Sequence, residues 1–323
     1  MTAAQHVPTW SVDRIVGAPP APLSTEVHRL TAAATEADGN PPLSEQTLVT
    51  LRAQDAGDRL LVFTVRTAGQ QDSELAGVAV VTGGVTGDTG DGAVLELVVA
   101  PDCRGEGAGT ALIEAVLAEN ITGLRGWSHG NHSAAADLAA RFGFRPVREL
   151  WRMRLTRAAV EQSVPALTLP EGVVLRPFVR GEDEEAWLAA NAAAFAHHPE
   201  QGSTTRADLE ARMDEDWFDA DGFLLAVREG DGALLGFHWT KIHQGVGAHP
   251  PMGEVYVVGV TPDAQGMGLG KALTIAGIEY LHRKGLQAIM LYVDADNAAA
   301  VALYRKLGFT RWDVDVMYAS TTA

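Results

Sequence analysis

The sequence has only one cysteine in 323 residues, Cys103, which excludes an internal disulfide and a cysteine-based zinc site and suits a reducing compartment. Basic residues are also few, because 25 Lys and Arg stand against 41 Asp and Glu, for a formal net charge of −16. The densest basic cluster is the three residues 282–284. Proteins that bind nucleic acid need a cationic face, so we expect no nucleic-acid partner.

Long apolar runs are missing as well. No stretch approaches the roughly 18 apolar residues that a membrane helix requires, and the first residues lack the basic and apolar regions of a signal peptide. The chain is nevertheless 46% hydrophobic and 20% charged, so it can build real cores. At about 150 residues per domain, its length suggests two domains. We expect a cytoplasmic monomer without membrane association.

The sequence contains an internal repeat. Residues 93–112, AVLELVVAPDCRGEGAGTAL, match residues 254–273, EVYVVGVTPDAQGMGLGKAL. Farther along, HSAAADLAARFGFRPVR at 132–148 matches NAAAVALYRKLGFTR at 297–311. Two landmarks in the same order and at nearly the same offset indicate a tandem duplication.

The boundary between the halves is expected where prolines interrupt the periodic pattern, at the linker 158–171. This places an N-terminal domain at 1–157 and a C-terminal domain at 172–323. Strand-like and helix-like segments alternate in both halves, which predicts an α/β fold with helices on the faces of a sheet in each domain.

Each half carries a glycine-rich loop after an apolar strand, at 104–109 and at 265–270. Such a loop, opening a helix, presents backbone N–H groups and the positive end of the helix dipole to an anion. Neither loop has the spacing of the nucleotide P-loop or of the dinucleotide motif. Both fit [Gln/Arg]-x-x-Gly-x-[Gly/Ala], which resembles the coenzyme A pyrophosphate loop of the GCN5-related N-acetyltransferase (GNAT) superfamily.

The resemblance implies two tandem GNAT domains, each a mixed, mostly antiparallel sheet flanked by helices, with acetyl-CoA as co-substrate. The coenzyme contacts that it implies in the first half are Leu97, Val98, Val99, Gly105, Glu106, Gly107, Ala108, Gly109 and Thr110. Those that it implies in the second half are Val258, Gly259, Val260, Gln265, Gly266, Met267, Gly268, Leu269, Gly270, Lys271, Asn297, Ala298, Ala299, Ala300, Val301 and Ala302. Gly259, in mid-strand, suggests a bulge or splay there that frees backbone groups for the coenzyme. Asn297 is expected to be the N-cap of the helix that follows it.

Acetyl transfer to an amine requires a neutral amine and protonation of the departing thiolate, which a carboxylate and a phenol can provide. The resemblance assigns these roles to Glu254 as general base and Tyr304 as general acid. The corresponding positions of the first half hold Ala93 and Ala139, so we expect the chemistry in the second half.

Further motifs resemble one tandem GNAT enzyme that acetylates the cysteinyl amine of a cysteine–glucosamine–inositol conjugate. These motifs lie at 42–46, 195–202, 236–243, 253–260 and 291–297. By this resemblance the acceptor contacts are Glu45, Glu200, Lys241 and Glu254. Tyr292 is placed in the same set, and packing in the core or against the coenzyme stays open for it. Since Glu45 belongs to the first half, we expect the acceptor to meet residues of both domains.

Two alternatives stay open at this point. A GNAT fold does not determine the acceptor, so another small amine or an aminoglycoside could be acetylated. A non-catalytic acyl-CoA sensor would suit the first half, although Glu254 and Tyr304 favour an enzyme. The histidines at 197, 198, 238, 243 and 249 do not have the spacing of paired ligands on one helix, and we expect no metal.

Overall fold

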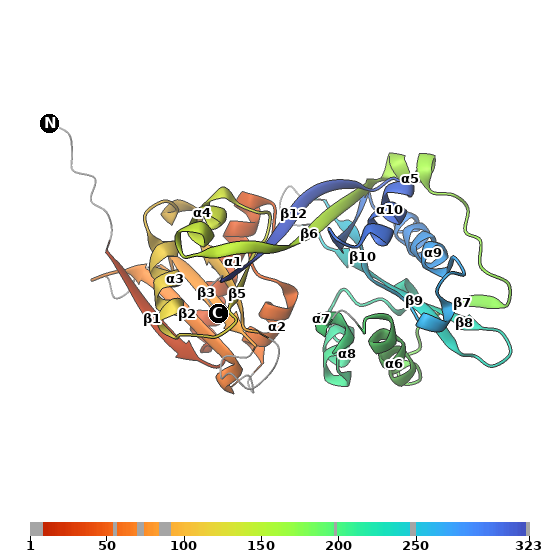
Figure 1. The fold of residues 1–323 in the computed structure, drawn as a ribbon, viewed down its shortest axis with the longest axis horizontal. Coiled ribbons are helices and arrows are strands. Elements are labelled where there is room, and N and C mark those ends of the chain that lie inside the picture. The colour runs from red at the N-terminus through yellow and green to blue at the C-terminus, as the bar shows by residue number, and fades with distance from the viewer. Residues whose placement is uncertain are drawn as a thin grey trace. The chain divides into compact units, whose positions relative to one another are not determined.

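A computed structural model describes residues 9–53, 57–69, 74–83, 92–196, 199–245 and 250–320 (Figure 1). The chain forms two compact units. The first consists of residues 1–150 and 314–323, and the second of residues 151–313. No helix in the described ranges is long and apolar enough to span a membrane.

The sheet of the first unit has the strand order β1-β2-β3-β4-β5-β12. Its strands are β1 (Trp10–Val16), β2 (Leu60–Thr67), β3 (Gly77–Thr82), β4 (Val94–Val99), β5 (Arg125–Ser128) and the end of β12 (Thr310–Ser320). Strands β1 to β4 pair antiparallel, β4 and β5 pair parallel, and β5 pairs antiparallel with β12. The prediction of a mixed, mostly antiparallel sheet is confirmed.

Helices cover both faces of this sheet (Figure 1). They are α1 (Ala21–Asp38), α2 (Glu45–Arg52), α3 (Ala108–Ala118) and α4 (Ser133–Arg141). Strand β2 is apolar on both sides because helices cover both faces of the sheet. Successive side chains of a strand point to opposite faces. Leu60 and Val62 pack in the core beneath α1 and α2, whereas Leu61, Phe63 and Val65 pack against α3.

The second unit repeats this topology with the strand order β6-β11-β10-β9-β8-β7. The strands are the end of β6 (Phe144–Thr156), β7 (Val173–Pro177), β8 (Phe223–Arg228), β9 (Leu234–His243), β10 (Met252–Val260) and β11 (Ala288–Asp294). Strands β7 to β10 pair antiparallel, and β10 and β11 pair parallel.

The helices of the second unit likewise pack on both faces of its sheet. They are α5 (Arg157–Ser163), α6 (Glu184–Ala194), α7 (Pro199–Gly202), α8 (Arg206–Met213), α9 (Leu269–Arg283) and α10 (Ala298–Lys306). Short 3₁₀ turns occur at Gly57–Arg59, Pro101–Cys103, Ala220–Gly222 and Pro262–Ala264. Helices α6 and α8 bury an aromatic cluster around Trp187 and Trp239, and α9 covers the opposite face.

Two equivalent strands of the repeat cross between the units. Strand β6 begins in the first unit and ends in the second, whereas β12 begins in the second and ends in the first. The segment 158–171, expected as a linker, contains most of α5. The limits 1–157 and 172–323 stay a prediction of where one repeat ends and the next begins.

Candidate functional site

The glycine-rich loop of the first unit joins β4 to α3. Gly105 and Gly107 have φ of 78° and 94°, in the left-handed region that favours glycine, and Gly107 is the N-cap of α3. Because the helix starts immediately after this turn, its first N–H groups face the loop as an anion site requires.

A cavity of about 530 Å³ opens beside this loop. Among the residues predicted to contact coenzyme, the cavity is lined by Leu97, Val98, Val99, Gly105, Gly107, Gly109 and Thr110. Ala108 instead packs in the core below, with 1% of its surface exposed. The volume lies in the range of ordinary small-molecule sites.

Arg104, the first residue of the loop motif, is held by Asp38 through two hydrogen bonds of 2.7 and 2.8 Å. This bidentate contact raises the pKa of Arg104 above its usual value. Trp10 supports the next turn, because its indole N–H donates to the Glu106 carbonyl at 2.8 Å. Side chains from β1 and from the end of α1 therefore hold the loop in place.

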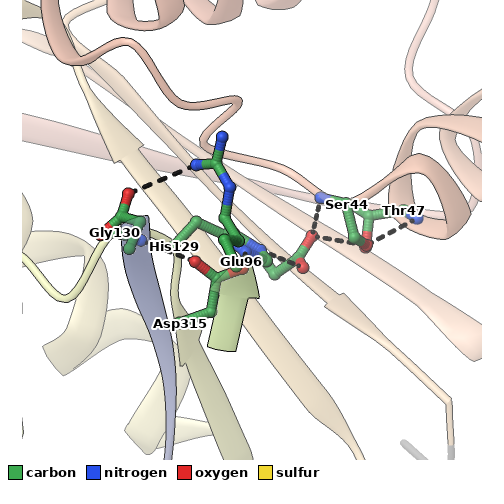
Figure 2. A network of polar contacts seen from close by, with 8 residues as sticks. Ser44, Thr47, Glu96, His129, Gly130 and Asp315 are labelled. Carbon is green, nitrogen blue, oxygen red and sulfur yellow. Dashed lines mark hydrogen bonds and ion pairs between the residues drawn. The ribbon is translucent and has the colours of Figure 1, made fainter. Parts of the chain in front are cut away.

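His129, which lines the cavity, belongs to a buried ionic network that no sequence pattern indicated (Figure 2). His129 donates through Nε2 to Glu96 at 2.9 Å and through Nδ1 to Asp315 at 3.0 Å. Burial alone would lower the pKa of His129, but the hydrogen bonds and charges of the two carboxylates raise it to about 9. His129 is therefore a cation at neutral pH. His129 and Asp315 are 186 residues apart, so no local pattern could have predicted this contact.

Glu96 also fixes the start of α2. Its carboxylate accepts from the backbone N–H of Ser44 at 2.9 Å and from the Ser44 hydroxyl at 3.2 Å (Figure 2). Ser44 in turn is the N-cap of α2, accepting from the N–H of Thr47. Glu45, predicted to contact the acceptor, is the first residue of this helix.

In the second unit the loop between β10 and α9 repeats the first. Gly266 and Gly268 have φ of 83° and 79°, and Gly268 is the N-cap of α9. Gly259 was expected at a bulge or a splay of its strand. Beyond Val255, β10 no longer pairs with the parallel strand β11 although both strands continue, so the splay is present and only the expected bulge is wrong. The bulge of β10 lies between Val255 and Val257, and Gly259 pairs regularly with Phe237. A Cβ on Gly259 would lie 2.6 Å from the Phe237 ring, so close packing explains the glycine.

Glu254 lies near the start of β10 and is 6% exposed, which excludes a solvated strand edge. Lys241 of β9 stands directly opposite it in the strand register, and its ammonium lies 4.4 Å from the centre of the Trp217 ring. Glu254 Oε2 lies 2.6 Å from Nε2 of His243, the last residue of β9. Sequence reasoning missed His243 because only the strand register places it beside Glu254.

The neighbouring strand β11 adds Tyr292 to this sheet region. Met290 is the register partner of Glu254, and Tyr292 follows two residues later on the same strand. Arg152, a residue that the sequence did not single out, is 4% exposed and lies over the Tyr292 and Trp312 rings. Lys241, Glu254 and Tyr292 thus occupy three adjacent strands.

Tyr304 lies on α10, where its ring packs edge-to-face against Phe309 at 5.8 Å. Burial raises the pKa of its phenol to about 12. Asn297 caps this helix by accepting from the Ala300 N–H at 3.1 Å, as its sequence position predicted.

The remaining candidate site residues are either buried or lie outside the part of the chain that the structure describes. His238 and Trp239, which belong to the motif at 236–243, are buried at 0% and 1% exposure. The side chain of Glu200, in α7, lies outside the described part, as do His197, His198 and His249. Within the described ranges, no group of three or more His, Cys, Asp or Glu could hold a metal.

Both halves of the chain match known acetyltransferases. A profile described as "Acetyltransferase (GNAT) family" matches residues 187–309, and one described as "Acetyltransferase (GNAT) domain" matches residues 64–146. A solved GCN5-related N-acetyltransferase from Sphaerobacter thermophilus shares 27% identity with a TM-score of 0.66, over 95% of both chains. A tandem GNAT protein from the clavulanic acid biosynthesis pathway has the same fold, with a TM-score of 0.70 at 21% identity, over 96% of this chain and 98% of its own. The fold and the paired loops therefore define an acetyl-CoA-dependent N-acetyltransferase of the tandem GNAT class.

The sequence relatives define the group more narrowly. The mycothiol acetyltransferase of Paenarthrobacter aurescens is 59% identical over 98% of both chains. That of Thermobispora bispora is 53% identical over 90% of this chain and 93% of its own. The chain belongs to the family of the mycothiol acetyltransferases.

Proposed function

We propose that the enzyme transfers the acetyl group of acetyl-CoA to the cysteinyl amine of a cysteinyl-glucosaminyl-inositol acceptor, giving mycothiol and CoA. The observation that carries the proposal is the identity of 46–59% to mycothiol acetyltransferases over nearly the whole chain. The buried carboxylate of Glu254 beside Lys241 and His243 supports it, because such a group can remove a proton from an ammonium.

The reaction divides between two groups of the second unit. Glu254 accepts the proton of the acceptor ammonium, so the neutral amine attacks the thioester. Tyr304 keeps its proton at neutral pH, since its pKa is about 12. Transfer from such a phenol to a thiolate whose acid has a pKa near 8.5 is uphill, so Tyr304 contributes mainly a hydrogen bond to the departing sulfur. The sulfur ends with the second proton that the attacking nitrogen gives up, which makes CoA thiol.

The loop at 265–270 and the start of α10 would hold coenzyme for this reaction, and Glu45, Glu200, Lys241 and Tyr292 would bind the acceptor. In the first unit, the cavity beside 104–109 would hold acetyl-CoA without turning it over. Ala93 and Ala139 supply neither base nor acid there. Monomeric state and cytoplasmic location remain predictions from the sequence.

A turnover assay tests the proposal against its alternatives. Release of CoA is measured with acetyl-CoA and, in parallel, the cysteinyl-glucosaminyl-inositol conjugate, other small amines and an aminoglycoside. We expect the cysteinyl conjugate to have the highest kcat/KM. A higher value for another amine would reassign the acceptor, and acetyl-CoA binding without any turnover would indicate a sensor.

Replacing Gly107 with Glu should remove coenzyme from the first unit while leaving kcat close to that of the wild type. A side chain is strained at a φ of 94°, and a carboxylate would repel phosphate at the N-cap of α3. Calorimetry should show one acetyl-CoA fewer per chain. Gly268→Glu, the equivalent change in the second unit, is the matched control and should abolish turnover.

Gly105→Glu is a second variant for the first unit. Its Cβ would meet no atom within 4 Å, although a side chain is strained at its φ of 78° as it is at Gly107. If folded Gly107→Glu and Gly105→Glu both lose turnover, the division of labour between the units is wrong.

Tyr304→Phe keeps the ring and its contact with Phe309 but removes the hydroxyl. We expect kcat to fall roughly 10-fold to 100-fold. This loss is at or below the low end of what general acids usually contribute to a rate, because the pKa of this phenol is poorly matched to that of the thiol. Acetyl-CoA affinity should stay nearly unchanged, since the lost interaction belongs to the transition state. An unchanged kcat would make Tyr304 a packing residue and leave water to protonate the thiolate.

A further inference from the structure

The contact between Glu254 and His243 has no role in the scheme above. His243 is the last residue of β9, two residues beyond Lys241, the register partner of Glu254. Alternation along a strand places residues 241 and 243 on the same face. The two side chains meet at 2.6 Å between Nε2 and Oε2, a distance across which a proton can pass directly from one to the other.

The two partners differ sharply in their access to solvent. The Glu254 side chain is 8% exposed, whereas the His243 side chain is 38% exposed. The imidazole therefore joins a nearly buried carboxylate to water. The nearby cation is Lys241, whose ammonium lies over the Trp217 ring at 4.4 Å and the Tyr256 ring at 5.3 Å.

The reaction requires a path by which a proton can leave Glu254. At neutral pH an ammonium acceptor and acetyl-CoA give an amide, CoA thiol and one released proton per turnover. The proton is taken up at Glu254, and it must leave before the carboxylate can act again. A carboxyl group with 8% exposure has little direct contact with water, whereas the imidazole beside it is 38% exposed.

We propose that His243 relays to solvent the proton that Glu254 takes from the acceptor amine. The inference rests on the proposed function, in which Glu254 is the base. Neutral His243, with its proton on Nδ1, accepts the Glu254 proton at Nε2, and the resulting imidazolium gives its Nδ1 proton to water. Glu254 is again a carboxylate, and exchange of the exposed ring with water restores the starting tautomer. His243 acts through Glu254 and is a positioning and relay residue.

Two substitutions separate a relay from a structural contact. His243→Gln keeps a hydrogen-bonding group near Glu254 but cannot carry a proton, whereas His243→Ala removes both functions and leaves space. We expect both variants to lower kcat with the cysteinyl acceptor by about tenfold or more, within reach of general acid–base effects. The affinity for acetyl-CoA should not change.

Added imidazole gives the readout that a purely structural role would not move. It should raise kcat of His243→Ala in a saturable way, and it should not stimulate the wild type or Glu254→Gln. Full activity of His243→Gln would overturn the relay and leave only a hydrogen-bonding role. The relay would also be overturned if His243→Ala lost activity and did not respond to imidazole while His243→Gln stayed active.

The outcomes also distinguish the relay from the proposed function. If Glu254→Gln is slow and His243→Gln is normal, only the relay is wrong. If Glu254→Gln is as fast as the wild type, the assignment of the base is wrong, and the relay is wrong with it.

Discussion

Glu254→Gln is expected to lower kcat by roughly 10²-fold or more, the usual effect of losing a positioned proton acceptor. The amide has the shape of the carboxylate, so acetyl-CoA binding and folding should be preserved. The defect should shrink as the pH rises, because an α-amino group titrates near 7.7–8.0 and more of the acceptor is then neutral without a base.

The measurement is the pH profile of kcat for Glu254→Gln and for wild type with the cysteinyl acceptor. Glu229→Gln is a suitable control, since Glu229 is an exposed carboxylate elsewhere in the second unit. Rates near those of the wild type at neutral pH would remove Glu254 from the mechanism. A defect of the same size at every pH would indicate that Glu254 positions the acceptor without taking its proton.

Gly277→Ala is expected to destabilise the second unit by about 3 kcal/mol or more, at the upper end of overpacking effects. A Cβ at Gly277, on α9, would lie 2.0 Å from Cε1 and 2.3 Å from Nδ1 of His238. The ring cannot move aside easily, because it is fully buried and its Nδ1 is hydrogen-bonded to the Leu273 carbonyl at 2.7 Å. Burial lowers the pKa of His238 to about 4, with this hydrogen bond opposing the shift, so the ring is neutral.

Urea unfolding measures this effect through the transition midpoint. Gly270→Ala in the same helix is the matched control, because its Cβ would meet Val260 at an ordinary 3.6 Å and alanine favours helix by up to about 1 kcal/mol. The double variant Gly277→Ala/His238→Ala should recover part of the loss, since the ring no longer occupies the space. An unchanged midpoint for Gly277→Ala would contradict this account of the packing between α9 and β9.

The class of the fold and its two glycine-rich loops were predictable because they depend on local features. Glycines at 105, 107, 266 and 268 adopt positive φ in turns of a few residues, and a repeat of such turns identifies the pattern twice. The Asn297 cap is local in the same sense. The alternative acceptors could not be separated by the residues alone, because a GNAT scaffold accepts many amines.

The partners of the site residues were not predictable. His243 lies beside Glu254 only because β9 and β10 pair in one particular register, and a shift by one residue would turn it to the other face. The close packing of Phe237 against Gly259 was not predictable for a related cause, since Phe237 reaches it from the neighbouring strand.

By itself, the sequence determined the duplication, the α/β class and the two glycine-rich loops, and it led us to predict a base and an acid in the second half. The tertiary structure alone decided that β6 and β12 cross between the units, that His129 is held between Glu96 and Asp315, and that His243 lies beside Glu254. The physical reason is the separation along the chain between the residues that interact. Turns, caps and periodic patterns are determined by neighbours in the chain, whereas strand register and buried ionic contacts join residues that only the completed sheet brings together.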